Sequence, residues 1–123
     1  MTAVPTAPAV EHETVDTVAI CSLDRLVPER GAAALVDDNQ VALFRIDRDG
    51  GVDVHAIDHR DPFTGANVLA RGIVGWADGR WYVASPLHKQ RFDLLTGVCL
   101  DDETVAVRVR LTQVVDGIVH VER

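Results

Sequence analysis

Two short segments carry the residues of this chain that are best suited to metal chemistry. They read Ile57-Asp58-His59-Arg60-Asp61-Pro62-Phe63 and Ser85-Pro86-Leu87-His88-Lys89-Gln90-Arg91. His59 and His88 with Asp58 or Asp61 would supply two imidazoles and one carboxylate, a donor set that suits Fe(II). Two histidines alone fall short of a structural zinc site. The alternative is that both histidines are polar loop residues, hydrogen-bonded to backbone or exposed at a binding surface.

Short β-strands joined by turns must position these segments. The dipeptides Asp49-Gly50, Asp78-Gly79 and Asp116-Gly117 are typical of tight hairpin turns between strands. Strands are expected over residues 17–21, 32–36, 41–46, 52–57, 81–84, 105–115 and 118–121. Single helical turns are expected over 23–26, capped by Ser22, and over 67–71. The sequence therefore predicts an all-β chain, folded as a small antiparallel sandwich or barrel.

Alternation of apolar and polar residues predicts which faces of these strands are buried. Ala42, Phe44 and Ile46 share one face of the strand over 41–46. On the long strand over 105–115, one face is expected to carry Val105, Val107, Val109 and Leu111, and the other Arg108, Arg110 and Thr112. Trp81, Phe92 and Leu94 are expected in the core, and Trp76 partly exposed.

Composition and charge narrow the class of protein. Its 123 residues suffice for one domain, expected over 17–123 after a disordered tail over 1–16. The net charge of -7 argues against nucleic-acid binding, and no apolar run approaches the roughly 20 residues that cross a membrane. With no secretory signal at the N-terminus, we expect a cytoplasmic protein. Cys21 and Cys99 form no paired motif and are expected to be buried thiols.

The histidine segments resemble the two ligand loops of the Rieske iron–sulfur domain. That family carries Cys-x-His in one loop and Cys-x-x-His in the other, the second commonly continuing to Phe-Asp and a Thr-Gly turn. This chain reads Ile57-Asp58-His59 and Ser85-Pro86-Leu87-His88, followed by Phe92-Asp93 and Thr96-Gly97. The resemblance implies a Rieske-like fold with a small subdomain that carries the two loops.

Both cysteine positions of the Rieske pattern are filled by other residues. A Rieske centre needs two thiolates and two imidazoles. Ile57 has no donor atom, the Ser85 hydroxyl is a poor substitute for a thiolate, and Cys99 lies beyond the loop. Ile57, His59, Ser85 and His88 are therefore interpreted as vestigial ligand positions, with no metal or other cofactor expected on this chain.

Two long blocks, over residues 58–75 and 85–102, resemble the small subunit of assimilatory NAD(P)H-dependent nitrite reductase. The resemblance extends from about residue 17 to the C-terminus. It implies an accessory subunit of a cytoplasmic enzyme that reduces nitrite to ammonia in nitrate assimilation. It further implies a large-subunit partner that carries FAD, an iron–sulfur cluster and sirohaem. No catalytic residue is expected here, because the sequence shows no nucleophile–base pair, Gly-rich phosphate loop or cysteine cluster.

Without a metal, the two loops are interpreted as a docking surface for the partner subunit. The docking candidates are Asp58, His59, Arg60, Asp61, His88, Lys89, Gln90 and Arg91. A mixed-charge patch of this kind suits a polar, electrostatically steered interface. Two alternatives stay open: a Rieske-type ferredoxin that serves an oxygenase, and a stand-alone mononuclear metal enzyme that uses His59 and His88.

Overall fold

The computed structural model describes residues 16–123, and nearly all of the expected disordered tail lies outside this range. The described chain is all-β and antiparallel, as predicted, with two short 3-10 turns. Three sheets have the strand orders β10-β11-β2, β3-β4-β5-β9 and β6-β7-β8. Their bounds are β2 Thr17–Ser22, β3 Gly31–Val36, β4 Asn39–Arg48, β5 Gly51–Asp58, β6 Ile73–Ala77, β7 Arg80–Ala84, β8 Arg91–Asp93, β9 Val109–Arg110, β10 Thr112–Val115 and β11 Ile118–Glu122.

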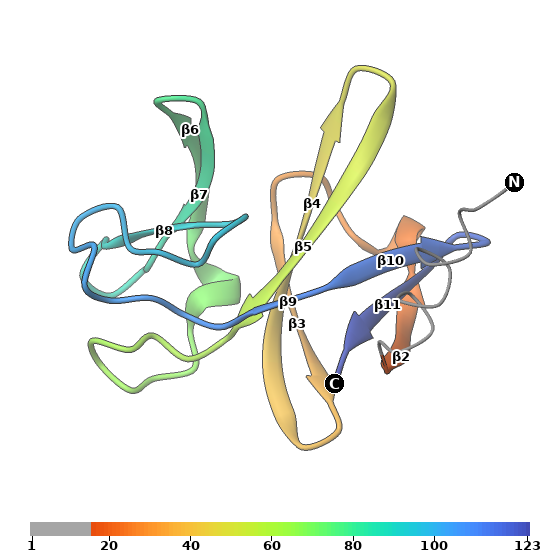
Figure 1. Ribbon diagram of the computed structural model, residues 1–123, viewed down its shortest axis with the longest axis horizontal. Helices are drawn as coiled ribbons and strands as arrows, with labels where there is room; N and C mark the ends of the chain where they lie inside the picture. The colour runs from red at the N-terminus through yellow and green to blue at the C-terminus, as the bar shows by residue number, and fades with distance from the viewer. Residues whose placement is uncertain (1–15) are drawn as a thin grey trace, which may run out of the picture.

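The long β4–β5 hairpin forms the middle of the molecule. Figure 1 shows it between the β6-β7-β8 sheet on one side and the β10-β11-β2 sheet on the other. The predicted Asp49-Gly50 turn joins the two strands, and Gly50 has the positive φ of 81° that such a turn requires. Because strand β4 has neighbouring layers on both faces, it contributes to two separate cores.

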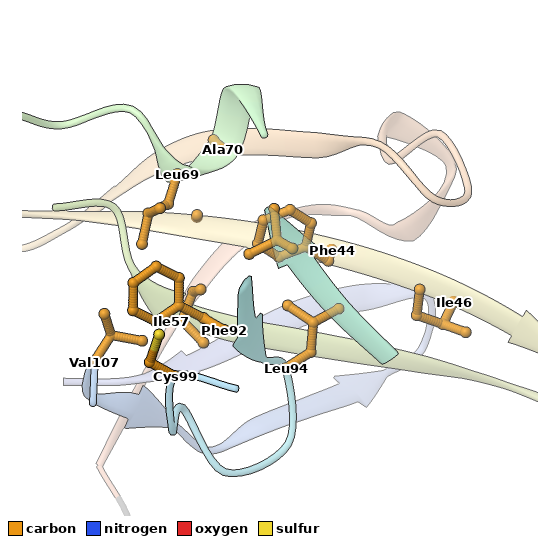
Figure 2. Packing of buried hydrophobic residues seen from close by; sticks show 11 residues of the cluster. Phe44, Ile46, Ile57, Leu69, Ala70, Phe92, Leu94, Cys99 and Val107 are labelled. Carbon is orange, nitrogen blue, oxygen red and sulfur yellow. The ribbon is translucent and has the colours of Figure 1, made fainter. Parts of the chain in front are cut away.

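Each face of β4 contributes to one apolar cluster. Ala42, Phe44 and Ile46 share the predicted face and pack with Ile57, Leu69, Ala70, Val83, Phe92, Leu94, Cys99 and Val107 (Figure 2). The other cluster contains Leu26, Val36, Val41, Leu43, Val54, Ala56, Val119 and Val121. The first cluster contacts the segment that carries His59, because Phe92 packs against Phe63 and the Ala70 amide donates to His59.

The histidine segments connect the central sheet to the small sheet. The first, which we name the His59 loop (59–68), leaves the end of β5 and leads into the 3-10 turn η2, Leu69–Arg71, as predicted for this stretch. In Figure 1 it is the yellow-green loop that follows β5. The second, the His88 loop (85–90), joins β7 to β8. Gly72 lies between the two, and a Cβ there would meet the Ala84 carbonyl oxygen at 2.3 Å, so only glycine fits.

The predicted long strand over 105–115 is wrong. The structure divides it into β9, which pairs with β5, and β10, which pairs with β11 in another sheet. Leu111 lies between them and is 58% exposed, whereas Arg110 is 3% exposed. The buried face changes because the chain passes from one sheet to the next. The Arg110 guanidinium is accommodated by the Glu122 carbonyl at 3.1 Å and the Asp58 carboxylate at 3.7 Å.

Several smaller predictions are confirmed. Ser22 caps the 3-10 turn η1, Leu23–Arg25, by accepting a hydrogen bond from the Asp24 amide at 3.3 Å. Phe92 and Leu94 are fully buried and Trp76 is exposed. Of the two cysteines, Cys99 is buried as expected, but Cys21 is only half-buried because it lines a groove between β2 and β3. Residues 16–123 contain no helix with the length and hydropathy of a membrane-spanning segment.

Candidate functional site

His59 is a buried structural residue of its loop. Its side chain is 5% exposed, and its Nδ1 accepts a hydrogen bond from the Ala70 amide at 3.0 Å. The His59 carbonyl accepts two more, from Val68 and Leu69, each at 3.0 Å. One residue thus holds the whole η2 turn in place. Burial, reinforced by the nearby Arg71 charge, lowers the pKa of His59 and favours the neutral ring that can accept at Nδ1.

Asp61 and Ser85 link the two loops. The Ser85 hydroxyl donates to Asp61 Oδ2 at 2.6 Å, and Asp61 Oδ1 accepts from the Phe63 amide at 2.8 Å. On the other loop, the Leu87 amide donates to the Ser85 hydroxyl at 3.3 Å. Asp61 and Ser85 are 0% and 1% exposed, so the hydrogen bond between them is buried, whereas the two bonds from the backbone amides are partly buried. Together the three bonds link the His59 loop to the His88 loop.

The residues present do not fit a [2Fe–2S] cluster. Ile57 is fully buried in the core with Phe92 and Cys99 (Figure 2), and its side chain has no donor atom. The Ser85 hydroxyl is committed to Asp61, and Cys99 is packed among apolar side chains. A Rieske centre needs two thiolates and two imidazoles, and the four ligand positions of this chain supply the imidazoles alone.

His88 lies in a different environment from His59. It is exposed, as are its neighbours Leu87 and Lys89. The His88 loop is closed by backbone hydrogen bonds from Ser85 to Gln90 at 2.8 Å and from Lys89 to Ser85 at 2.9 Å, with Lys89 at a φ of 64°. The two histidines therefore follow the polar-loop alternative: one hydrogen-bonded to backbone, the other exposed. Across residues 16–123, no three His, Cys, Asp or Glu side chains form a group suited to a metal ion.

The structure divides the docking candidates into buried and accessible residues. The side chains of His59 and Asp61 are buried, because each accepts a hydrogen bond from a backbone amide inside the fold, so the single chain does not present them at its surface as the docking prediction requires. Arg60, His88 and Lys89 are exposed, and Asp58, Gln90 and Arg91 are half-buried. Two of the half-buried residues already have ion-pair partners, Asp58 with Arg110 and Arg91 with Asp101.

Two apolar residues at the loops were missed by the sequence prediction. Phe63 is 38% exposed and Leu87 is 48% exposed. The sequence contained a signal for them, because Asp61-Pro62-Phe63 and Ser85-Pro86-Leu87 share one pattern: a polar residue, a proline, then an apolar residue. In each, the polar side chain accepts a hydrogen bond from the amide of the apolar residue, a local turn that Asp and Ser readily form.

Comparison with known proteins gives a consistent result. The family model of the Rieske-like [2Fe-2S] domain matches residues 16–122. The nitrite reductase (NADH) small subunit of Escherichia coli K12 is 44% identical over 101 residues, which cover 82% of this chain and 92% of that protein. A solved structure from Mycobacterium tuberculosis, assigned as an NADH-dependent nitrite reductase small subunit, superposes with a TM-score of 0.82 at 48% identity. The match covers 89% of this chain and 96% of the chain in that structure.

A third relative differs in its length. The nitrite reductase [NAD(P)H] large subunit of Klebsiella oxytoca contains a segment 42% identical to this chain over 103 residues. The match covers 84% of this chain and 10% of that much longer protein. In that relative, a domain of this type is therefore part of the same polypeptide as the rest of a large subunit.

Proposed function

Because this chain belongs to the Rieske-like family and, within it, to the small subunits of NADH-dependent nitrite reductase, we propose that it is an accessory subunit that binds no redox cofactor of its own. The observation that carries the proposal is the 44% identity across 92% of a protein that is itself a nitrite reductase small subunit. In this proposal the flavin, iron–sulfur and sirohaem chemistry belongs to a large subunit, and both subunits are cytoplasmic.

The chemistry of the loops supports a role without electron transfer. Ile57 is a core residue and Ser85 a loop link, so neither former ligand position offers a thiolate. The buried His59 uses Nδ1 for a structural hydrogen bond. Proton transfer by the loops is also poorly supported, because His88 and Lys89 are exposed to solvent. We therefore assign the chain no catalytic residue.

A large subunit is the proposed partner. The Klebsiella relative supports this choice, because a domain that is covalently joined to a large subunit in one protein commonly binds it as a separate chain in another. The accessible loop residues Arg60, His88 and Lys89, with Asp58, Gln90 and Arg91 at half exposure, are the proposed docking residues.

The experiment is co-expression of this chain with the large subunit of the same organism, followed by purification through a tag on this chain. We expect a complex with flavin and sirohaem absorption that oxidises NADH or NADPH when nitrite is added. Recovery of this chain alone, although the large subunit is expressed and soluble in the same cells, would contradict the proposal.

Metal analysis separates this proposal from the alternatives. An accessory subunit purified alone under anaerobic conditions is expected to be colourless and free of stoichiometric iron. A Rieske-type ferredoxin would hold about two irons per chain, and a mononuclear enzyme about one. Either stoichiometry, lost on substitution of His59 or His88, would replace the accessory function with a redox one.

A further inference from the structure

We propose that the two loops end in a docking tip with an apolar centre and positively charged residues around it. This tip inserts into an apolar hollow on the large subunit that is surrounded by acidic side chains. The Phe63–Leu87 tip consists of Arg60, Phe63, Leu87, His88 and Lys89, all of which are exposed. The inference rests on the proposed function and specifies its interface. It adds two apolar side chains, Phe63 and Leu87, to the exposed polar residues that the sequence singles out.

A rigid link holds the two apolar residues close together. The amides of Phe63 and Leu87 are the two ends of the hydrogen-bond chain through Asp61 and Ser85. The backbone amides of both residues are therefore tied to the same pair of buried side chains. Phe63 is further restrained by its contact with the Phe92 ring, whose centroid lies 6.1 Å from its own. Anchors that are held in place before binding lose little conformational entropy in the complex.

The charge of the tip is opposite to that of the whole chain. Within the His59 and His88 loops the formally charged residues are Arg60, Asp61 and Lys89, and Asp61 is buried. Exposed formal charge on the loops is therefore positive, on a chain with a net charge of -7. Beside the loops, the half-buried Asp58 pairs with Arg110 and the exposed Asp101 pairs with Arg91. A partner with acidic side chains around an apolar hollow complements this arrangement.

The large subunit fits this chemistry better than a second copy of the chain. Two copies that met tip to tip would bring Arg60 and Lys89 of one chain against the same residues of the other, and like charges in contact disfavour a complex. The large subunit has independent support, since the Klebsiella relative carries a domain of this type within its large-subunit polypeptide. An apolar centre with a charged rim is also the usual anatomy of a protein–protein interface.

The test is a titration of the purified large subunit with full-length variants of this chain. We expect Leu87→Asp to weaken binding at least tenfold, since it places a carboxylate at the centre of an apolar contact beside acidic groups. The double variant Arg60→Glu, Lys89→Glu is expected to weaken binding at low salt by a similar factor. The difference in affinity between this double variant and the wild type should become smaller as salt is raised, because screening removes the electrostatic part of the interaction.

Leu95→Asp is the matched control. Leu95 is 72% exposed, more than Leu87, and lines a groove with Asp53 and His55 near the start of β5, away from the His59 loop at its end. It should bind like the wild type, and all variants should keep the thermal midpoint of unfolding. The charge-reversal variant, which changes only exposed side chains, serves as the test if Leu87→Asp is destabilised.

The possible outcomes test the proposed interface and the proposed function separately. Wild-type affinity in both the Leu87→Asp and the charge-reversal variants would overturn the tip and leave the accessory function intact. Failure of the wild-type chain to bind the large subunit would overturn both. A dimer of this chain that Leu87→Asp dissociates would show that a second copy, and not the large subunit, covers the tip.

Discussion

The His59 and His88 loops are linked to each other through Asp61 and Ser85, yet their histidines lie in opposite environments. His59 is buried and accepts a backbone hydrogen bond, whereas His88 is exposed. A metal cluster would impose one environment on both imidazoles, since both would have to reach the same iron. The difference indicates that each loop of this chain is stabilised by ordinary protein contacts.

The two positions at which the Rieske pattern has cysteine also differ from each other. Ile57 is part of the apolar core, and Ser85 donates a buried hydrogen bond to Asp61. The His59 loop is therefore stabilised by the packing of Ile57 just before it and by the hydrogen bond from Ser85 to Asp61. The His88 loop depends on Ser85 and on its own backbone hydrogen bonds. Substitutions in the two loops should show this inequality directly.

The largest effect is expected at Ile57. Ile57→Ala should lower the free energy of unfolding by roughly 3 to 4 kcal/mol, because it removes fully buried methyl groups from a close-packed core. Ile57→Val, the graded control, should cost about 1 kcal/mol. Urea denaturation followed by tryptophan fluorescence measures both. Equal, small losses for the two variants would show that this position is not packed as the structure describes.

The next largest effect is expected at Asp61, which links the two loops. Asp61→Ala should lower the free energy of unfolding by about 3 kcal/mol, because the Phe63 amide and the Ser85 hydroxyl both lose a buried partner. Asp61→Asn keeps an oxygen for the Phe63 amide and should cost about 1 kcal/mol.

Hydrogen exchange gives a second measurement of the same link. In Asp61→Ala the amide of Leu87 should exchange faster, although Leu87 lies in the other loop, because its acceptor Ser85 is no longer fixed. Unchanged exchange at Leu87 would show that the loops are independent.

The two histidines give the most direct comparison. His59→Ala should lower the free energy of unfolding by about 2 kcal/mol, because it leaves the Ala70 amide without its acceptor. His88→Ala removes an exposed side chain and should change it by no more than about 0.5 kcal/mol. His59→Asn offers an oxygen near the position of Nδ1 and should recover part of the loss. Equal losses at His59 and His88 would contradict the assignment of one structural and one exposed histidine.

The sequence predicted the elements and the loops of this fold better than the role of each polar residue. Asp-Gly turns and the alternation over 41–46 are local signals, and the structure confirms both. The single strand over 105–115 failed because a period-two pattern continues across Leu111 while the chain changes sheets. No local signal marks such a change, since the pairing partners are distant in sequence.

Burial at the candidate site could not be predicted for a related reason. Whether a histidine or aspartate is buried depends on hydrogen-bond partners that the fold brings to it, here Ala70 for His59 and Ser85 for Asp61. The missing thiols, in contrast, could be identified from the spacing of Ile57 and Ser85 from their histidines. The residue types at positions 57 and 85 are thus visible in the sequence, whereas the contacts that Ser85 and His59 make were not predictable from it.

The smallest predicted effect is a pH dependence that distinguishes the loops. Burial lowers the pKa of His59 below its usual 6.5 in the folded state, so the unfolded chain binds this proton first as the pH falls. The stabilisation is complete above pH 6.5 and declines as the pH is lowered through the folded pKa. His55 contributes with the same sign, since burial lowers its pKa as well. The free energy of unfolding, measured between pH 7.5 and 5.5, should therefore fall less steeply in His59→Asn than in the wild type. An unchanged slope in His59→Asn would mean that the buried His59 does not contribute to the pH dependence of stability in the way its burial predicts.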